Sequence, residues 1–335
     1  MKIYTNTAVA ALLASSVLGA AQPVAAANTS ALANAVEAHA NYSGVIDTMA
    51  EAIGRQYPIE ATADKIVMAL RRAGEDKALL VLGEAEFVKQ INAVLWEAAH
   101  DLHLRVRSEA AAKARTKAGG GKAVPRMRRV VRRERSSAIG TTSIKAEMLD
   151  AKTGLITITS PIYNNIDRFT AALGALIGAE NIIIDVRTCP GGTVPGVQYF
   201  TSQFYGERTH LSSRISRESD TPQKLWTVDT MVGSDFADKN LFVLTSARTA
   251  SGAEALSYAL KNTDRATIVG EKTAGAGNAG AYLGIGEGLL MFLPLSQTIS
   301  PKTGKPWEAR GVVPHIATAA DKALEVVLNK IKSST

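Results

Sequence analysis

A serine stands between a predicted buried strand and a predicted helix, where a nucleophile could act. The strand covers 240–245, and the helix begins near Ser251. The first N–H groups of a helix have no partner within it, and the helix dipole there favours developing negative charge. The same position suits a helix N-cap, for which Ser is a preferred residue. Taken alone, the pattern favours the cap, because no G-x-S-x-G motif surrounds Ser251.

Two glycines follow a second predicted buried strand. The run 181–187 is rich in Ile and Val, and Gly191 and Gly192 come shortly after it. Glycines at such a point let the backbone approach a ligand closely and present N–H groups to it. The stretch therefore fits either one half of an oxyanion hole or an ordinary strand-to-helix turn.

Bases and acids are the next requirement, because a serine hydroxyl is a poor nucleophile without a neighbouring base. The chain has five histidines: His39, His100, His103, His210 and His315. They form no H-E-x-x-H pair and accompany no Cys cluster, so we expect no metal site and no cofactor. Glu308 lies in a stretch rich in turn residues, where it could orient a base or only pair with Arg310.

The elements that must position these residues change character along the chain. Residues 31–103 carry apolar residues at three- to four-residue spacing, which predicts helices and an N-terminal helical domain at 28–107. Strand and helix patterns alternate at 141–335, which predicts one α/β domain. The expected strands are 154–160, 181–187, 240–245, 266–270 and 288–294, and the expected helices are 166–177, 194–204, 251–261 and 319–331.

The first 27 residues resemble a targeting segment. Lys2 precedes an apolar stretch at 8–21, and small residues follow at 24–27. This pattern predicts a signal peptide at 1–27 with cleavage after Ala26 or Ala27, and a periplasmic or secreted protein. Mass spectrometry of the mature N-terminus tests the prediction, and an intact Met1 on exported protein would contradict it.

Charge and composition exclude several classes of protein. Of 335 residues, 46% are hydrophobic, which excludes a disordered chain, and one Cys excludes a disulfide framework. The net charge of +7 is local, because residues 105–135 hold twelve Lys and Arg against two Glu. Residues 108–140 are therefore expected to be a basic linker or insertion. The segment 105–135 could contact an anionic surface, although a solvated insertion is favoured. Export makes nucleic acid an unexpected partner, and no later apolar run is long enough to span a membrane.

In their order along the chain, these features resemble the tail-specific (C-terminal-processing) serine proteases. The branch related to the tricorn core and to interphotoreceptor retinoid-binding protein is the more similar one. The resemblance rests on the stretches 101–106, 183–192, 245–254, 270–275 and 307–314. It implies a core like that of the ClpP and crotonase proteins, preceded here by a helical bundle. Between the bundle and the core, only the basic segment is available, so we expect no PDZ domain.

The resemblance also assigns roles to individual residues. It implies that Ser251 is the nucleophile and that Gly191 and Gly252 supply the N–H groups of the oxyanion hole. Ala276 stands where the larger branch has a lysine base, and Lys272 is out of register. The tricorn-like branch uses a histidine and a glutamate instead, which implies His103 as the base and Glu308 as its partner. Cys189 and His315 stand where the family often has Asn and Asp.

Two functions from different classes follow. The first is an exported serine peptidase that hydrolyses peptide or protein substrates by acyl transfer. The second is a non-catalytic protein that binds an apolar ligand or a peptide on the same fold, a hypothesis that the missing lysine motivates. The distance between His103 and Ser251 distinguishes them, because a base must lie within hydrogen-bond reach of its nucleophile.

Overall fold

The computed structural model describes residues 40–110, 142–230 and 233–333, which belong to one compact unit. The predicted signal peptide at 1–27 and most of the predicted linker at 108–140 lie outside these residues. Among the helices described, none is both long and apolar enough to cross a membrane.

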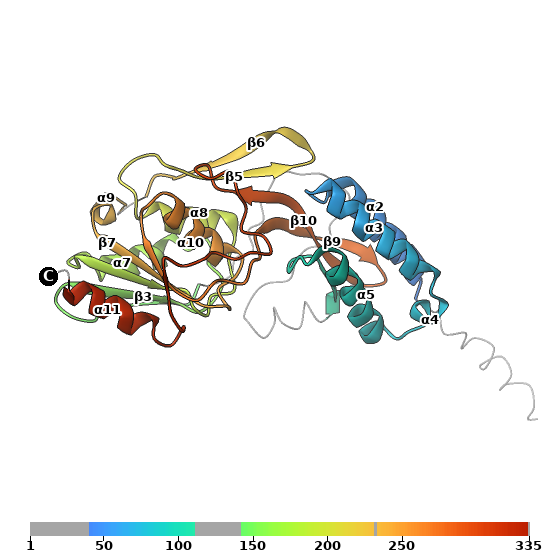
Figure 1. The fold of residues 1–335 in the computed structure, drawn as a ribbon, viewed down its shortest axis with the longest axis horizontal. Coiled ribbons are helices and arrows are strands. Elements are labelled where there is room, and N and C mark those ends of the chain that lie inside the picture. Colours follow the sequence, from blue (N-terminus) through green and yellow to red (C-terminus); the bar gives the residue numbers. More distant parts are fainter. Residues whose placement is uncertain (1–39, 111–141, 231–232, 334–335) are drawn as a thin grey trace, which may run out of the picture. The chain divides into compact units, whose positions relative to one another are not determined.

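The first sheet has six strands and carries the predicted α/β pattern (Figure 1). In spatial order its strands are β11 (Ile316–Ala317), β8 (Thr267–Gly270), β7 (Asn240–Thr245), β4 (Asn181–Asp185), β3 (Thr153–Ile158) and β2 (Ile144–Met148). All neighbours are parallel except β2, which runs antiparallel to β3. Every residue of β4 is buried, as the unbroken apolar run Ile182–Ile184 predicts for a strand covered on both faces.

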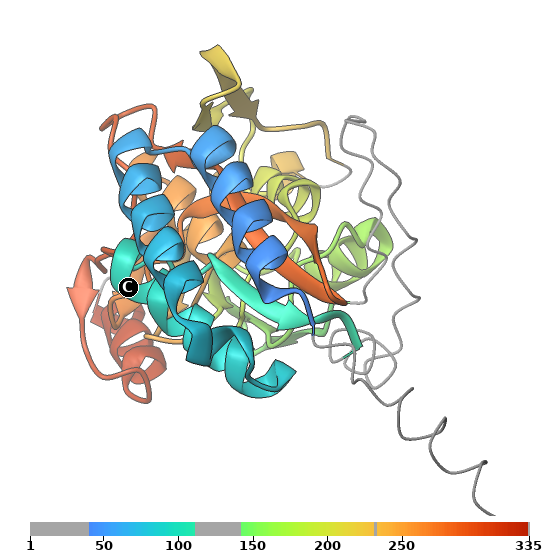
Figure 2. The ribbon, with the colours of Figure 1, turned by 90° about the vertical axis from the view of Figure 1, so that its right-hand side faces the viewer.

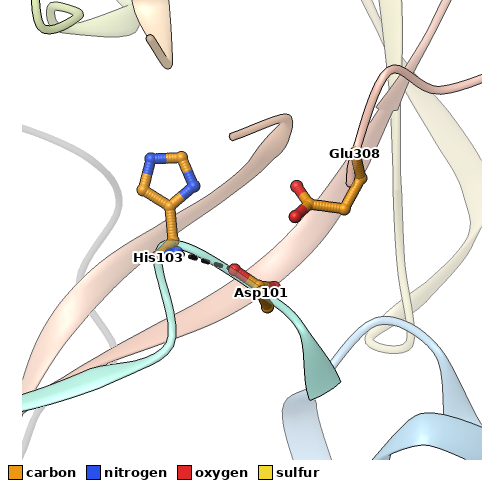
Figure 3. Close-up of side chains that lie close together, drawn as sticks. All are labelled: Asp101, His103 and Glu308. Carbon is orange, nitrogen blue, oxygen red and sulfur yellow. Dashed lines mark hydrogen bonds between the residues drawn. The ribbon is translucent and has the colours of Figure 1, made fainter. Parts of the chain in front are cut away.

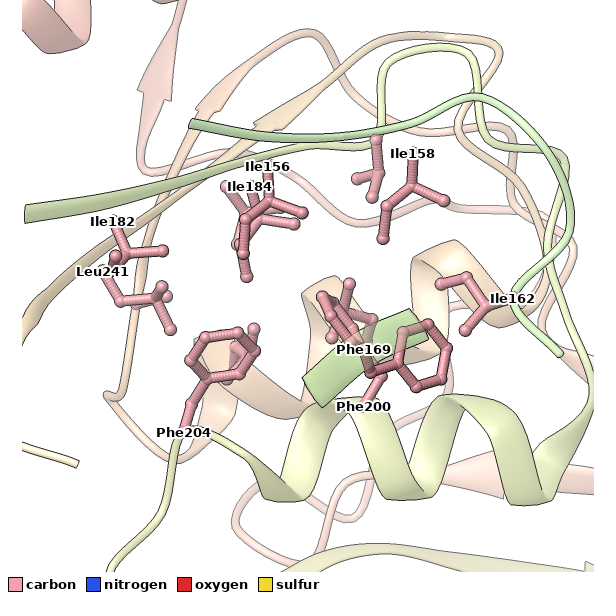
Figure 4. Close-up of a cluster of buried hydrophobic side chains, with 14 of the residues drawn as sticks. Ile156, Ile158, Ile162, Phe169, Ile182, Ile184, Phe200, Phe204 and Leu241 are labelled. Atoms are coloured by element: carbon pink, nitrogen blue, oxygen red, sulfur yellow. The ribbon is translucent and has the colours of Figure 1, made fainter. Parts of the chain in front are cut away.

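Helices cover both faces of this sheet. One face packs against α7 (Ile166–Gly174), α8 (Val194–Ser202) and α10 (Gly252–Asn262), and α11 (Ala323–Ser333) covers the other. Figure 4 shows Ile182 and Ile184 of β4 in the same cluster of buried side chains as Phe200 of α8 and Phe169 of α7. The next residue in the strand, Ile183, points to the opposite face and joins the core with Val327 of α11. A short helix, α9 (Gly233–Phe236), precedes β7.

A second sheet of five strands was largely missed by the sequence patterns, which predicted only part of one strand. Its strands are β1 (Arg105–Ser108), β5 (His210–Ser216), β6 (Ser219–Trp226), β9 (Asn278–Gly286) and β10 (Leu289–Ile299). All pairs are antiparallel, and the long strand β10 pairs with β9 on one side and with β1 and β5 on the other. Strand β9 contains three glycines and two alanines, a composition with low strand propensity, so its pairing with β10 decides its conformation.

The N-terminal helices are α2 (Tyr42–Gln56), α3 (Glu60–Glu75), α4 (Lys77–Leu80) and α5 (Glu84–Ala99). Figure 2 looks onto these helices, which lie in front of the second sheet. Their buried side chains share one hydrophobic core with strands β1, β9 and β10. The helices expected to form a domain of their own therefore pack on strands whose sequence lies in the expected α/β domain. Residues 105–108, expected at the end of the helical part, are a strand of that sheet.

Candidate active site

Ser251 lies in a turn that begins at the end of the buried strand β7 and ends where α10 begins. Its backbone has φ 52° and ψ −117°, a conformation that residues with a side chain rarely adopt. Such strain costs about 1–3 kcal/mol and persists only where the surroundings enforce it. Here the carboxylate of Glu254 accepts the N–H of Ser251 at 2.8 Å. The turn therefore presents the hydroxyl in a fixed direction at the positive end of α10.

The glycine loop after β4 meets this turn, because β4 and β7 are parallel neighbours whose carboxyl ends share one edge of the sheet. Thr249 donates its hydroxyl to the Val186 carbonyl at 2.9 Å, and Ala250 N–H donates to the Cys189 carbonyl at 3.2 Å. Gly191 has φ 135°, and a Cβ there would lie 2.9 Å from Cβ of Ser251. Glycine is therefore required at this close approach.

The amides around this contact have the character expected of an oxyanion hole. Among the described residues, no acceptor is recorded for the N–H groups of Gly191, Gly192 or Gly252. A Cβ on Gly252 would lie 2.7 Å from the Gly192 nitrogen, so these backbone segments are in contact. Two helices, α8 and α10, begin beside them.

His103 lies in the turn before β1 of the second sheet, and its side chain reaches Ser251. Its Nε2 lies 3.0 Å from Oγ of Ser251, although 148 residues separate the two in the sequence. Oδ1 of Asp101 accepts the N–H groups of His103 at 2.8 Å and Leu104 at 3.2 Å, which fixes the turn that leads into β1. The imidazole stacks on Phe292 of β10, with ring centroids 5.2 Å apart.

Glu308 completes the group and points toward the ring of His103 (Figure 3). Its Oε2 accepts the N–H groups of Gly277 and Asn278, both at 2.6 Å. Its Oε1 and Nδ1 of His103 are buried and have no hydrogen-bond partner in the structure described. Because Nε2 of His103 is directed at Ser251, Nδ1 is the ring nitrogen left to face Glu308.

Burial sets the protonation states of this group. Desolvation lowers the pKa of His103, with Arg105 acting in the same direction and Asp101 opposing it. Desolvation raises the pKa of Glu308 to about 8, helped by the nearby Asp101 and opposed by the N–H donors of Asn278 and Gly277. At neutral pH His103 is therefore neutral, as a general base must be, and Glu308 holds a proton.

The structure brings together the five predicted site residues: His103, Gly191, Ser251, Gly252 and Glu308. Three further residues at the site were not predicted to have roles there. Asp101 and Asn278 hold each other, because Nδ2 of Asn278 donates to Oδ2 of Asp101 at 2.9 Å. Glu254 carried a readable signal, since an acid three residues after a Ser is a capping-box spacing.

No lysine among the described residues takes the base position. Ala276 is buried, and its N–H donates to Glu254 at 2.8 Å, whereas Lys272 is exposed. Cys189 is buried behind the glycine loop, and desolvation raises its pKa to about 11, so it is an unreactive thiol.

Asp101, His103 and Glu308 each offer a ligand atom within 4.8 Å of the others, a spacing that a metal ion could use. The oxygens of Asp101, however, already accept four donors: the amides of His103 and Leu104, the Tyr57 hydroxyl and the Asn278 side chain. These residues therefore fit a hydrogen-bonded base better than a metal centre.

Part of the chain matches the model of a known protein family. Residues 152–318 match the model of peptidase family S41. The matched range contains Gly191, Ser251, Gly252 and Glu308, whereas His103 precedes it. The matched range therefore contains the candidate nucleophile, whereas the candidate base lies before it.

Curated relatives are similar over part of their length. The carboxyl-terminal-processing protease of Synechocystis sp. is 30% identical over 125 residues, which cover 37% of this chain and 28% of the relative. The carboxy-terminal-processing protease of Bartonella bacilliformis is 24% identical over 165 residues, 48% of this chain and 37% of the relative. The chain thus matches well under two thirds of the length of these curated relatives.

Solved structures share the fold over most of this chain. A lipoprotein from Streptococcus agalactiae has a TM-score of 0.59 at 13% identity, covering 88% of this chain and 97% of that one. The photosystem II D1 C-terminal processing protease has 0.54 at 16% identity, covering 83% and 93%. The tricorn protease has 0.51 at 13% identity, covering 88% of this chain and 36% of its own. These similarities agree with the predicted fold.

Proposed function

Starting from the peptidase family S41 domain that this chain carries, we propose that it is a serine peptidase that hydrolyses peptide bonds by acyl transfer. The observation that carries the proposal is the 3.0 Å contact between Nε2 of His103 and Oγ of Ser251. That distance is within the range over which a general base takes a proton.

In the proposed mechanism, Oγ of Ser251 attacks the carbonyl carbon of a peptide bond while its proton passes to Nε2 of His103. The oxyanion of the tetrahedral intermediate binds the N–H groups of Gly191 and Gly252, at the positive ends of α8 and α10. Protonated His103 then gives its proton to the leaving amine. Water, activated by the same imidazole, hydrolyses the acyl-enzyme and releases Ser251.

Glu308 is the proposed partner of the base. When ionised, its Oε1 can accept the Nδ1–H of His103, which leaves Nε2 free of hydrogen and ready to accept the serine proton. The carboxylate also stabilises the imidazolium that forms during the reaction. This role agrees with the direction of the Glu308 side chain in Figure 3.

The alternative function, a non-catalytic binding protein, receives less support. It requires no contact between a base and Ser251, no strained serine and no unpaired amides beside it. All three features are present among the described residues. Each is expected of an acyl-transfer site, so the peptidase is the better proposal.

The oxyanion hole offers a direct test of this function. In Gly252→Ala, the added Cβ would lie 2.7 Å from the Gly192 nitrogen and 2.9 Å from Cγ2 of Val197, forcing the two amide donors apart. We expect kcat for peptide hydrolysis to fall about 10²- to 10³-fold, the usual cost of losing one donor. Peptide cleavage measured by mass spectrometry, with circular dichroism to check the fold, gives the result.

Gly174→Ala is the matched control, because a Cβ at Gly174 meets nothing within 4 Å. We expect it to keep wild-type kcat. A folded Gly252→Ala variant with full activity would contradict the proposed oxyanion hole. A wild-type protein that cleaves no peptide in a broad mixture would contradict the proposed function itself.

Export and the surface role of residues 105–135 stay proposals that rest on the sequence. The apolar stretch at 8–21 supports a periplasmic or secreted peptidase, and the basic segment supports contact with an anionic surface. Deleting residues 111–137 should abolish any salt-sensitive binding to anionic vesicles, and unchanged binding would remove the second proposal.

A further inference from the structure

A six-residue segment that runs from Thr273 to Asn278, the first residue of β9, binds every carboxylate described above around the candidate site. The hydroxyl of Thr273 and the N–H groups of Gly275 and Ala276 donate to Glu254, at 2.5, 2.7 and 2.8 Å. The next two N–H groups, those of Gly277 and Asn278, donate to Glu308. The segment ends with the Asn278 side chain, which donates to Asp101.

Each of these carboxylates acts on a different part of the site. Glu254 holds the N–H of Ser251 and so maintains the strained turn of the nucleophile. Glu308 faces the imidazole of His103, and Asp101 holds the backbone N–H of the same histidine. The proposed nucleophile follows a strand of the first sheet and the proposed base precedes a strand of the second, and this segment is hydrogen-bonded to the carboxylates that hold both.

We propose that Asn278 is a positioning residue that holds the base of the proposed peptidase in register with its nucleophile. It contacts two carboxylates at once, Asp101 through its side chain and Glu308 through its backbone N–H. Its neighbours in the segment hold Glu254, which fixes Ser251. The proposal rests on the proposed function and adds a residue that touches neither substrate nor reacting atoms.

The side chain at position 278 acts as a hydrogen-bond donor. Asn278 is fully buried, and Oδ2 of Asp101 receives two donors, Nδ2 of Asn278 and the hydroxyl of Tyr57, both at 2.9 Å. An apolar residue would remove one donor from a buried carboxylate, which is unfavourable because the remaining charge is less well compensated. An Asp would put two carboxylates in contact, which raises the affinity of the whole group for protons.

Tyr57 extends the same network into the N-terminal helices. It follows α2 directly, is 1% exposed and belongs to the core that those helices share with β10. Its hydroxyl and the Asn278 amide meet on one oxygen of Asp101. The position of His103 therefore depends on both the helical part and the segment before β9.

Two substitutions at position 278 test the proposal. Asn278→Ala should lower kcat about 10- to 100-fold with KM within twofold of wild type, because the base shifts while the substrate contacts remain. Asn278→Asp should raise the pKa of His103, read from its imidazole NMR signal, by about one unit, because a negative charge is added nearby. His103→Gln identifies that signal among the five histidines.

Asn262→Asp is the matched control, because it makes the same change on α10, where the Asn262 amide donates only to the Tyr258 carbonyl. It should leave kcat and the His103 titration unchanged. If Asn278→Asp does not fold, Tyr57→Phe removes the other donor to the same oxygen of Asp101 and should lower kcat as much as Asn278→Ala does. The double variant Tyr57→Phe/Asn278→Ala should lose less kcat than the product of the two single losses.

The outcomes separate this inference from the proposed function. Wild-type kcat in folded Asn278→Ala, or an unmoved His103 titration in Asn278→Asp, would overturn the positioning role while leaving the peptidase intact. A His103 titration that moves as expected, in a protein that cleaves no peptide, would support the positioning geometry and reject the peptidase.

Discussion

Replacing Ser251 or His103 with Ala is expected to lower kcat about 10⁴- to 10⁶-fold, and the double variant is expected to be no worse than the poorer single one. The reason is that the two side chains act as one unit through their 3.0 Å contact. Once the nucleophile is gone, the base has no proton to take. Steady-state kinetics on a cleaved peptide and labelling with a fluorophosphonate, a serine-reactive probe, measure the effect.

A matched control exists for the histidine. His100 lies three residues before His103, caps α5 with φ 49° and packs edge-on against Trp96. His100→Asn keeps a residue that tolerates this conformation and should retain wild-type kcat. Independent, multiplicative losses at Ser251 and His103 would show that the two residues do not form one catalytic unit. Fluorophosphonate labelling that persists in Ser251→Ala would place the nucleophile elsewhere.

Peptidase activity is expected to rise with pH through a midpoint near 8, the pKa to which burial raises Glu308. Below that pH the protonated Glu308 carboxyl, which faces Nδ1 of His103, can donate a hydrogen to that nitrogen and so favours the tautomer that carries its hydrogen on Nε2. That tautomer cannot accept the serine proton. Above it, ionised Glu308 accepts Nδ1–H and Nε2 becomes the base. The pH dependence of kcat/KM reports this midpoint for the free enzyme.

The His103 titration itself should not limit activity in this range. Its pKa is lowered, chiefly by desolvation, so the imidazole is already neutral near pH 7. Glu308→Gln removes the titrating carboxyl, and we expect the limb near pH 8 to disappear and kcat at pH 9 to fall about 10²- to 10⁴-fold. A Glu308→Gln variant that keeps the rising limb would show that another group titrates there. Glu325→Gln, on the exposed side of α11, is the matched control, and it should change neither the rising limb near pH 8 nor kcat at pH 9.

The central strands of the parallel sheet, β4 and β7, could be predicted from the sequence. The runs at 181–187 and 240–245 are short and β-branched or apolar, and strands covered by helices on both faces require that composition. Because the carboxyl ends of parallel strands share one edge, these patterns also place Gly191 near Ser251. The second sheet could not be predicted in this way, since strand β9 is mostly glycine and alanine and forms because β10 pairs with it.

The sequence by itself determined where the candidate nucleophile lies: Ser251 stands between a buried strand and a helix, with glycines after the neighbouring strand. Its proposed role came from the family resemblance, because the local pattern alone favours a helix cap. Local pattern fixes these positions, because each residue lies within a few residues of the element that holds it. His103 and Glu308 entered through the family resemblance, since no local pattern relates them to a serine so distant in sequence.

Only the tertiary structure decided how His103, the proposed base, is held. The pairing of β1 with β10 carries His103 to Ser251, and contacts between residues as far apart as Asp101 and Asn278, 177 positions, hold it there. Such contacts depend on the packing of two sheets, which residue spacing does not encode. The strained backbone of Ser251 is a property of the same packing, because Glu254 and the 273–278 segment enforce it from outside the turn.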